Sequence, residues 1–151
     1  MKIAIACDHA GFVLKDTVIT QIKKHESEVI DFGTDNATTP VDYPDYAAKL
    51  AQAVASGKAD RGIMLCGSGI GACITANKFK GVRAAACHDT YSAAQGVAHD
   101  DMNVLCMGAR VIGSSLACSL VDAFLTTSFT KEPRHMRRLE KLKAIENANM
   151  K

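Results

Sequence analysis

At 151 residues the chain has the length of one ordinary domain, and its 48% of apolar residues can build a core without disulfides or metal, so we expect a single domain over residues 1–151. The net charge is only +2 and the sequence has no long basic stripe, which argues against a nucleic-acid partner. No apolar run approaches the ~20 residues of a membrane-spanning helix, so we expect no membrane partner either.

Segments with the apolar pattern of buried strands alternate along the chain with segments whose apolar residues recur at helical spacing. In chain order, the predicted elements are a strand at 2–7, a helix at 11–25, a strand at 28–33, a helix at 44–56, a strand at 61–66, a helix at 70–79, a strand at 82–88, a helix at 90–98, a strand at 103–108, a helix at 114–126 and a basic helix at 134–147. Strands separated by helices of this length pair in parallel through right-handed crossovers. The sequence therefore predicts an α/β fold, a three-layer, doubly wound, Rossmann-like sandwich with a five-stranded parallel sheet.

Six cysteines are spread along the chain, at positions 7, 66, 73, 87, 106 and 118. No two of them form the C-x-x-C pattern of zinc ribbons and thioredoxin-like proteins, so we predict no metal site. We interpret most of them as small hydrophobic residues in a reducing cytoplasm. Asp8 and His9 interrupt the first apolar run too early for a signal peptide, which also favours a cytoplasmic protein.

Ligands of doubly wound sheets bind outside the carboxyl ends of the strands. The side chains that follow the predicted strands at this edge are Asp8, His9, the segment Cys66 to Gly71, His88, Asp89 and Arg110. The Asp8–His9 pair alone is a weak signal, since Asp8 could simply cap the helix that follows it.

The segment after the third strand is the most informative one. Cys66 precedes the glycine-rich run 67–71, whose backbone N–H groups could approach an anion at the start of a helix. A thiol beside such a turn suggests chemistry on a negatively charged small molecule. The glycines and Ala72 also fit a dinucleotide-binding fingerprint, with Asp89 placed 20 residues after Gly69. That fingerprint usually opens the first βαβ unit, however, and a tight turn without a ligand is a further alternative.

Two basic features lie away from this edge. His99 ends the fourth predicted helix at the opposite edge, so it could act on the same ligand only if a symmetric partner brought it there. Arg134 and Arg138 are four residues apart on one helix face, and two guanidinium groups suit a phosphate. The alternatives are a histidine that stabilises a helix C-terminus and a solvated basic face paired with Glu132 and Glu140.

Taken in order, these segments resemble the type B ribose-5-phosphate isomerases, a family that also includes galactose-6-phosphate isomerase subunits and allose-6-phosphate isomerases. The resemblance covers essentially the whole chain. It rests on residues 7–11, 42–47, 66–71, 76–78 and 82–84, on His99 with Asn103 and Val104, on 108–110, and on Arg134 and His135 with Arg138.

The resemblance implies the interconversion of ribose 5-phosphate and ribulose 5-phosphate in the non-oxidative pentose phosphate pathway, without metal or organic cofactor. The reaction would pass through an open-chain sugar and a cis-enediolate, with Cys66 as the base, since Ala72 stands where part of the family has glutamate. Ser68 and the backbone amides of the loop, Gly67, Gly69 and Gly71 among them, would stabilise the enediolate oxygens. His99 would assist ring opening.

The resemblance also implies how the sugar phosphate binds. Arg134, Arg138, Arg110 and His9 would bind the phosphate, while Asp8 and Tyr43 hold sugar hydroxyls. The family site lies between subunits, with His99 and Arg110 reaching into the neighbour's pocket, so we expect a homodimer or a tetramer.

One position departs from the family. Asp100 stands next to His99 where the family usually has asparagine, and an ionised carboxylate would repel a developing oxyanion. The sequence leaves two alternatives open: an isomerase of allose 6-phosphate or galactose 6-phosphate, and a non-catalytic module that binds a nucleotide or a sugar phosphate.

Overall fold

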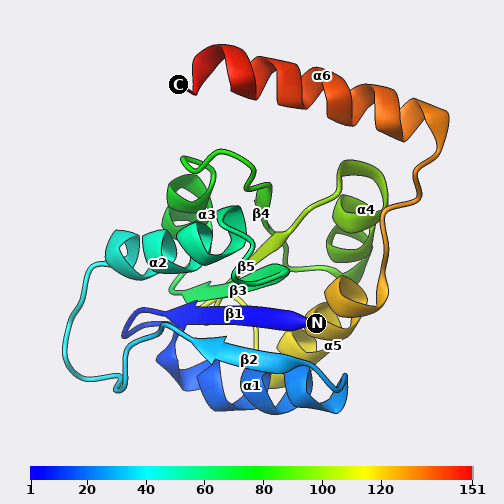
Figure 1. Cartoon of the computed structure of the whole chain (residues 1–151). Helices are drawn as coiled ribbons and strands as arrows, with labels where there is room; N and C mark the ends of the chain where they lie inside the picture. Colours follow the sequence, from blue (N-terminus) through cyan, green and yellow to red (C-terminus); the bar gives the residue numbers. More distant parts are fainter. Residues whose placement is uncertain (151) are drawn as a thin grey trace.

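A parallel sheet lies at the centre of the molecule, which a computed structural model describes over residues 1–150 (Figure 1). Its strands are β1 (Lys2–Cys7), β2 (Glu28–Asp31), β3 (Arg61–Cys66), β4 (Ala84–Ala86) and β5 (Val104–Gly108). They pair in the order β2-β1-β3-β5-β4, and every pair is parallel. The predicted α/β sandwich with a five-stranded parallel sheet is thereby confirmed for the described residues. Lys151 lies outside them, so the prediction of one domain over 1–151 stays a prediction.

Helices cover both faces of the sheet, which is why its strands are apolar nearly throughout. A 3-10 turn, η1 (Phe12–Leu14), precedes the helices, which are α1 (Lys15–Lys24), α2 (Tyr43–Ala55), α3 (Ile70–Ala76), α4 (Thr90–Asp100), α5 (Ser114–Thr126) and α6 (Pro133–Asn149). One hydrophobic cluster joins the sheet to α1, α4 and α5, and a second joins it to α2 and α3. Parallel pairing places the carboxyl ends of β1, β3 and β5 side by side.

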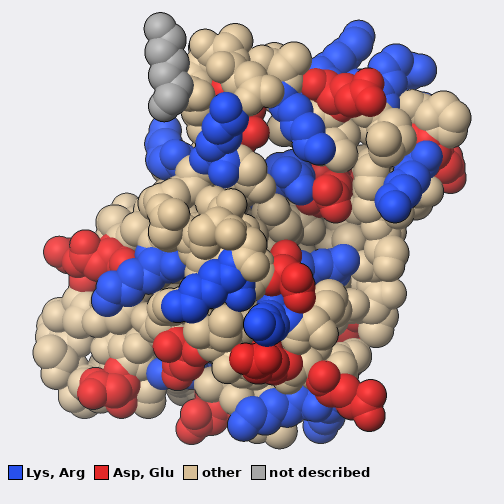
Figure 2. All heavy atoms as spheres, in the orientation of Figure 1, with Lys and Arg blue, Asp and Glu red and all other residues tan. Residues whose placement is uncertain are grey.

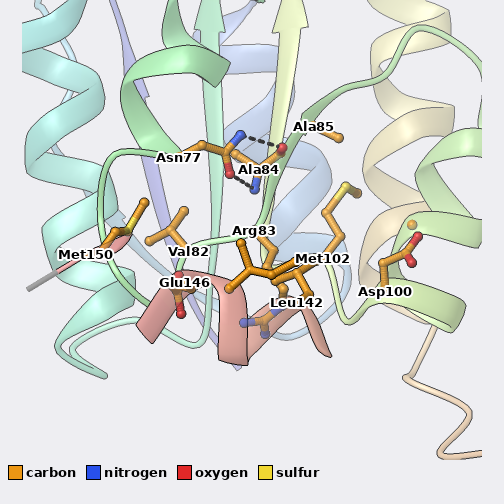
Figure 3. Close-up of a pocket in the computed structure, with 12 residues that line it drawn as sticks. Asn77, Val82, Arg83, Ala84, Ala85, Asp100, Met102, Leu142, Glu146 and Met150 are labelled. Carbon is orange, nitrogen blue, oxygen red and sulfur yellow. Dashed lines mark hydrogen bonds between the residues drawn. The ribbon is translucent and has the colours of Figure 1, made fainter. Parts of the chain in front are cut away.

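The predicted boundaries are wrong at α3 and β4, which are both shorter than expected. Asn77 explains both differences, because its side-chain amide pairs with the edge strand. Nδ2 of Asn77 donates to the carbonyl of Ala84 at 2.8 Å, and the Ala84 N–H donates to Oδ1 at 2.9 Å (Figure 3). An amide that imitates a neighbouring strand in this way ends the helix at Ala76 and fixes the start of β4.

The last helix stands apart from the other layers. Figure 1 shows α6 crossing above the rest of the fold, and within residues 1–150 its buried side chains are His135 and Leu139. Near its other end, Glu146 accepts a hydrogen bond from the Gly81 N–H at 2.8 Å. Between these two attachments lies a cavity of about 400 Å³, lined among others by Val82, Met102 and Leu142 (Figure 3). Basic and acidic side chains both lie on the surface of α6, beside uncharged ones (Figure 2). Across residues 1–150, each helix is too short or too polar to cross a bilayer.

Candidate active site

The strand register brings the predicted ligand edge together. Cys7 pairs with Leu65 and Cys66 pairs with Gly108, so the segments that follow β1, β3 and β5 leave the sheet beside one another. They surround a cleft of about 360 Å³. The residues that line it are Asp8, His9, Ala10, Tyr43, Cys66, Gly67, Ser68, Gly71, Arg110 and Val111.

Cys66 is held at the floor of this cleft by the loop that follows it. The side chain is only 4% exposed, and its Sγ accepts a hydrogen bond from the Gly69 N–H at 2.9 Å. Gly69 has φ +82°, and a Cβ at this position would lie 3.2 Å from the carbonyl carbon of Met107. Glycine therefore permits the turn that aims an N–H at the sulfur, and such a donor stabilises negative charge on it.

The same loop contacts the side chains that close the cleft. A Cβ at Gly71 would lie 2.5 Å from Cζ of Tyr43, so the tyrosine ring leans over the loop only because residue 71 has no side chain. Oγ of the exposed Ser68 accepts a hydrogen bond from the Ile70 N–H at 3.2 Å. The loop thus presents a hydroxyl, a phenol and a buried thiol around one space.

Asp8 and His9 are both oriented by backbone donors. Oδ1 of Asp8, which is 6% exposed and lines the cleft, accepts the Gly11 N–H at 2.9 Å. The capping alternative is wrong, because α1 begins only at Lys15 and no side chain caps it or η1. Nδ1 of His9 accepts the Val41 N–H at 3.1 Å. A neutral His9 ring must then carry its proton on Nε2, which makes that nitrogen a donor for a ligand.

Arg110 lies in the cleft of its own chain. Its N–H donates to the Gly67 carbonyl at 3.0 Å, and a Cβ at Gly67 would lie 3.4 Å from its Nη1. This placement differs from the expectation that Arg110 reaches into a neighbour's pocket. The reason is the register, because Gly108 pairs with Cys66 and the chain beyond it must pass beside Gly67.

The remaining predicted site residues lie outside this cleft. His99 is the penultimate residue of α4 and stacks on His135. Arg134 and Arg138 are exposed on α6, and Nε of Arg134 lies 3.1 Å from Oε2 of Glu132, one of the two acidic partners that the solvated alternative named. Asp100 is exposed and lies on the wall of the cavity under α6 (Figure 3). Within one chain, the predicted site residues therefore form two separate groups, one around the Cys66 cleft and one on α4 and α6.

Two further residues of the ligand edge have structural partners. Nε2 of His88 accepts the Gly108 N–H at 2.9 Å. Asp89 caps α4 by accepting the Ser92 N–H at 2.7 Å, which lowers the pKa of its carboxyl. The dinucleotide alternative needed the Asp89 carboxylate for its ligand, but this carboxylate already caps α4. Sequence reasoning missed Ala10 and Val111, whose only signal is that they adjoin His9 and Arg110.

The other cysteines differ sharply in acidity. Burial raises the pKa of Cys7 and of Cys87 to about 11, as expected for thiols that serve as small hydrophobic residues. Hydrogen bonding from the Cys106 thiol lowers the pKa of Cys73, on α3, to about 7 against the effect of burial. Cys73 therefore does not fit the interpretation of a simple hydrophobic residue.

Known proteins match this chain over almost its full length. A protein-family model described as Ribose/Galactose Isomerase matches residues 3–142. The chain is 46% identical to Ribose-5-phosphate isomerase B of Escherichia coli (strain K12) over 145 residues, 96% of each chain. Its structure matches that of Ribose-5-Phosphate Isomerase B of Clostridium thermocellum with a TM-score of 0.93 and 46% identity, covering 98% of this chain and 99% of that one. It also matches the structure of Ribose-5-phosphate Isomerase B of Mycoplasma genitalium with bound ribulose-5-phosphate. That match has a TM-score of 0.91 and 38% identity, and it covers 97% of this chain and 96% of that one.

Proposed function

The chain belongs to the Ribose/Galactose Isomerase family, and on that premise we propose that it interconverts D-ribose 5-phosphate and D-ribulose 5-phosphate. Membership confirms the resemblance seen in the sequence. The observation that carries the proposal is the thiol of Cys66, buried at the floor of a polar cleft with the Gly69 N–H 2.9 Å from its sulfur.

Cys66 is the base of the proposed reaction. Its thiolate takes the proton from C2 of the open-chain aldose, the C1–C2 double bond forms, and negative charge collects on O1. The same sulfur then returns a proton to C1, O1 is protonated and O2 loses its proton, which gives the ketose. Ser68 and the loop amides of Gly67, Gly69 and Gly71 stabilise the enediolate oxygens, where fixed donors help most in the transition state.

The polar groups around the cleft bind the sugar. Asp8 and Tyr43 line the same cleft as Cys66 and hold sugar hydroxyls, while Arg110 and Nε2 of His9 bind the phosphate. Binding the phosphate away from the reacting carbons anchors the sugar for proton transfer.

A second copy of the chain completes the site. His99 opens the sugar ring, Arg134 and Arg138 bind the phosphate, and Asp100 lies beside the substrate, but these residues lie away from the cleft of their own chain. We therefore expect a homodimer or a tetramer whose active site is shared between subunits. The enzyme needs no metal or organic cofactor. It works in the cytoplasm, where its free cysteines stay reduced.

The test is a coupled assay of ribose 5-phosphate against allose 6-phosphate and galactose 6-phosphate. We expect the pentose phosphate to be turned over with the highest kcat/KM, and Cys66→Ala to abolish turnover while phosphate binding persists. Equal or better turnover of a hexose phosphate would reject the pentose assignment. Ligand binding and biological function that both survive Cys66→Ala would instead identify a non-catalytic binding module. Cys118→Ala, which removes a free thiol that does not line the cleft, is the matched control.

A further inference from the structure

His135 joins α6 to α4 through a ring stack. It is only 1% exposed, and its imidazole lies against that of His99 with ring centroids 4.0 Å apart and an interplanar angle of 24°. The two rings belong to different helices, and His135 is one of the two buried side chains through which α6 contacts the body of the described chain. One face of the His99 ring is therefore set by an aromatic neighbour from α6.

Side-chain hydrogen bonds restrain the orientation of both imidazole rings. Nδ1 of His135 lies 2.5 Å from Oγ1 of Thr130, and the Thr130 N–H donates to the Ala98 carbonyl at 3.0 Å. Nδ1 of His99 lies 3.1 Å from Nε2 of Gln95, and a side-chain amide at that nitrogen is a donor. Nδ1 of a neutral His99 then accepts, so its proton sits on Nε2, the nitrogen left to exchange protons with a ligand.

The surroundings disfavour a positive charge on His135. Burial lowers the pKa of its imidazole, the charges of His99, Arg134 and Arg138 lower it further, and only Glu132 opposes them. Its Nε2 is buried and meets no hydrogen-bond partner among residues 1–150. Within the chain, His135 is thus a buried aromatic ring that one hydrogen bond to Thr130 orients.

Opening a ribofuranose requires well-placed proton transfers. The anomeric hydroxyl loses a proton, the bond from C1 to the ring oxygen breaks, the ring oxygen gains a proton, and C1 becomes an aldehyde. A group that moves these protons must keep its nitrogen at a fixed distance and angle from the sugar, because small displacements cost much of the rate.

We propose that His135 is a positioning residue for ring opening, whose stacked ring holds the imidazole of His99 with Nε2 directed at the sugar. The proposal rests on the proposed function, in which His99 opens the furanose. It adds a residue that touches neither the sugar nor the phosphate and acts only through His99.

Two substitutions separate the effect of the ring stack from that of the hydrogen bond to Thr130. His135→Phe keeps a stacked ring and loses the bond to Thr130, whereas His135→Ala loses both. Each is assayed for isomerisation of ribose 5-phosphate, which starts from a furanose, and for exchange of solvent deuterium into C1 of ribulose 5-phosphate. The exchange, followed by NMR, starts from an open-chain ketose and needs only the enediolate step.

We expect His135→Ala to lower kcat/KM for ribose 5-phosphate about tenfold while the deuterium exchange stays near the unmodified rate. His135→Phe should recover most of the lost turnover. Equal losses in both assays for His135→Ala, no loss in either, or a His135→Phe variant as slow as His135→Ala would each overturn the proposal. If circular dichroism shows that His135→Ala does not fold, His135→Asn replaces it, since asparagine can still bond to Thr130 without a ring. Failure of the proposed function looks different: the unmodified chain would then show neither isomerisation nor exchange.

Discussion

The backbone N–H of Gly69 points at the sulfur of Cys66 from 2.9 Å, and the left-handed backbone of Gly69, with φ +82°, is what aims it. The loop therefore does two things with one residue: it turns the chain from β3 into α3 and places a donor on the thiol. A substitution at Gly69 should disturb both.

We expect Gly69→Ala to lower kcat by about 10- to 100-fold, because the N–H moves off the sulfur and the loop off the enediolate oxygens. The left-handed backbone should also cost about 1 kcal/mol of stability, and the added Cβ, 3.2 Å from the Met107 carbonyl carbon, should add to that cost. Gly57→Ala is the matched control, since Gly57 has φ +75° and no atom within 4 Å of the added Cβ. It should lose stability but not kcat. Equal activity in the two variants would show that the Gly69 turn does not serve the chemistry.

Gly71 permits Tyr43 to lean over the loop, and Gly71→Ala should displace that ring. The added Cβ would lie 2.5 Å from Cζ of Tyr43, but the ring is 41% exposed and can swing outward at little cost in stability. We expect KM for ribose 5-phosphate to rise about tenfold with little change in Tm, since a hydroxyl contact worth about 1.4 kcal/mol is lost. In a Tyr43→Ala background, Gly71→Ala should raise KM no further. Additive effects in this double-mutant cycle would contradict the contact.

Asp100→Asn should keep or raise kcat/KM. The carboxylate is exposed and lies away from the Cys66 cleft of its own chain, so its replacement removes a negative charge without breaking a buried contact. Steady-state kinetics with ribose 5-phosphate measures this, and a large fall in kcat/KM would show that the carboxylate takes part in the reaction. Asp101→Asn is the matched comparison, because Oδ2 of Asp101 lies 2.8 Å from Nη2 of Arg83. That change should lower the stability by up to about 1 kcal/mol and leave kcat unchanged.

Strands and helices that are determined by the local pattern of apolar residues could be predicted from the sequence. The strands β1, β3 and β5 lie where apolar runs end at polar or glycine residues, and their parallel order places Asp8, Cys66 and Arg110 at one edge. Side-chain contacts between different elements decided the rest. The end of α3 depends on the contact of Asn77 with Ala84, which no periodicity reveals. The spacing of the sequence likewise gave no sign that the ring of His99 would meet His135.

Near neutral pH, Cys73 should be alkylated faster than Cys7 and Cys87. Its pKa of about 7 leaves much of it as thiolate at pH 7.5, whereas Cys7 and Cys87, with pKa values of about 11, stay protonated. Iodoacetamide labelling followed by peptide mass spectrometry should show Cys73 reacting faster, with a rate that rises as the pH passes about 7. Because folding lowers this pKa from 9.0, the thiolate stabilises the fold above pH 9, and that contribution is lost as the pH falls through about 7. Cys73→Ala should remove the rise in stability with pH that this thiol contributes between these limits. Labelling of Cys87 at the rate of Cys73 would contradict the difference in acidity.

A site shared between subunits predicts complementation between two defective chains. Cys66→Ala retains His99, and His99→Asn retains Cys66, so a mixed dimer of the two holds one site with both residues intact if His99 comes from the partner. Random pairing of co-expressed chains makes half of the dimers mixed, and each mixed dimer has one working site of two, so about a quarter of the unmodified activity should return. The control pairs the unmodified chain with the Cys66→Ala, His99→Asn double variant. If each site draws both residues from one chain, that control keeps about half of the activity while the complementing pair stays inactive. In a shared site the control instead falls to about a quarter, because its mixed dimers hold no intact site.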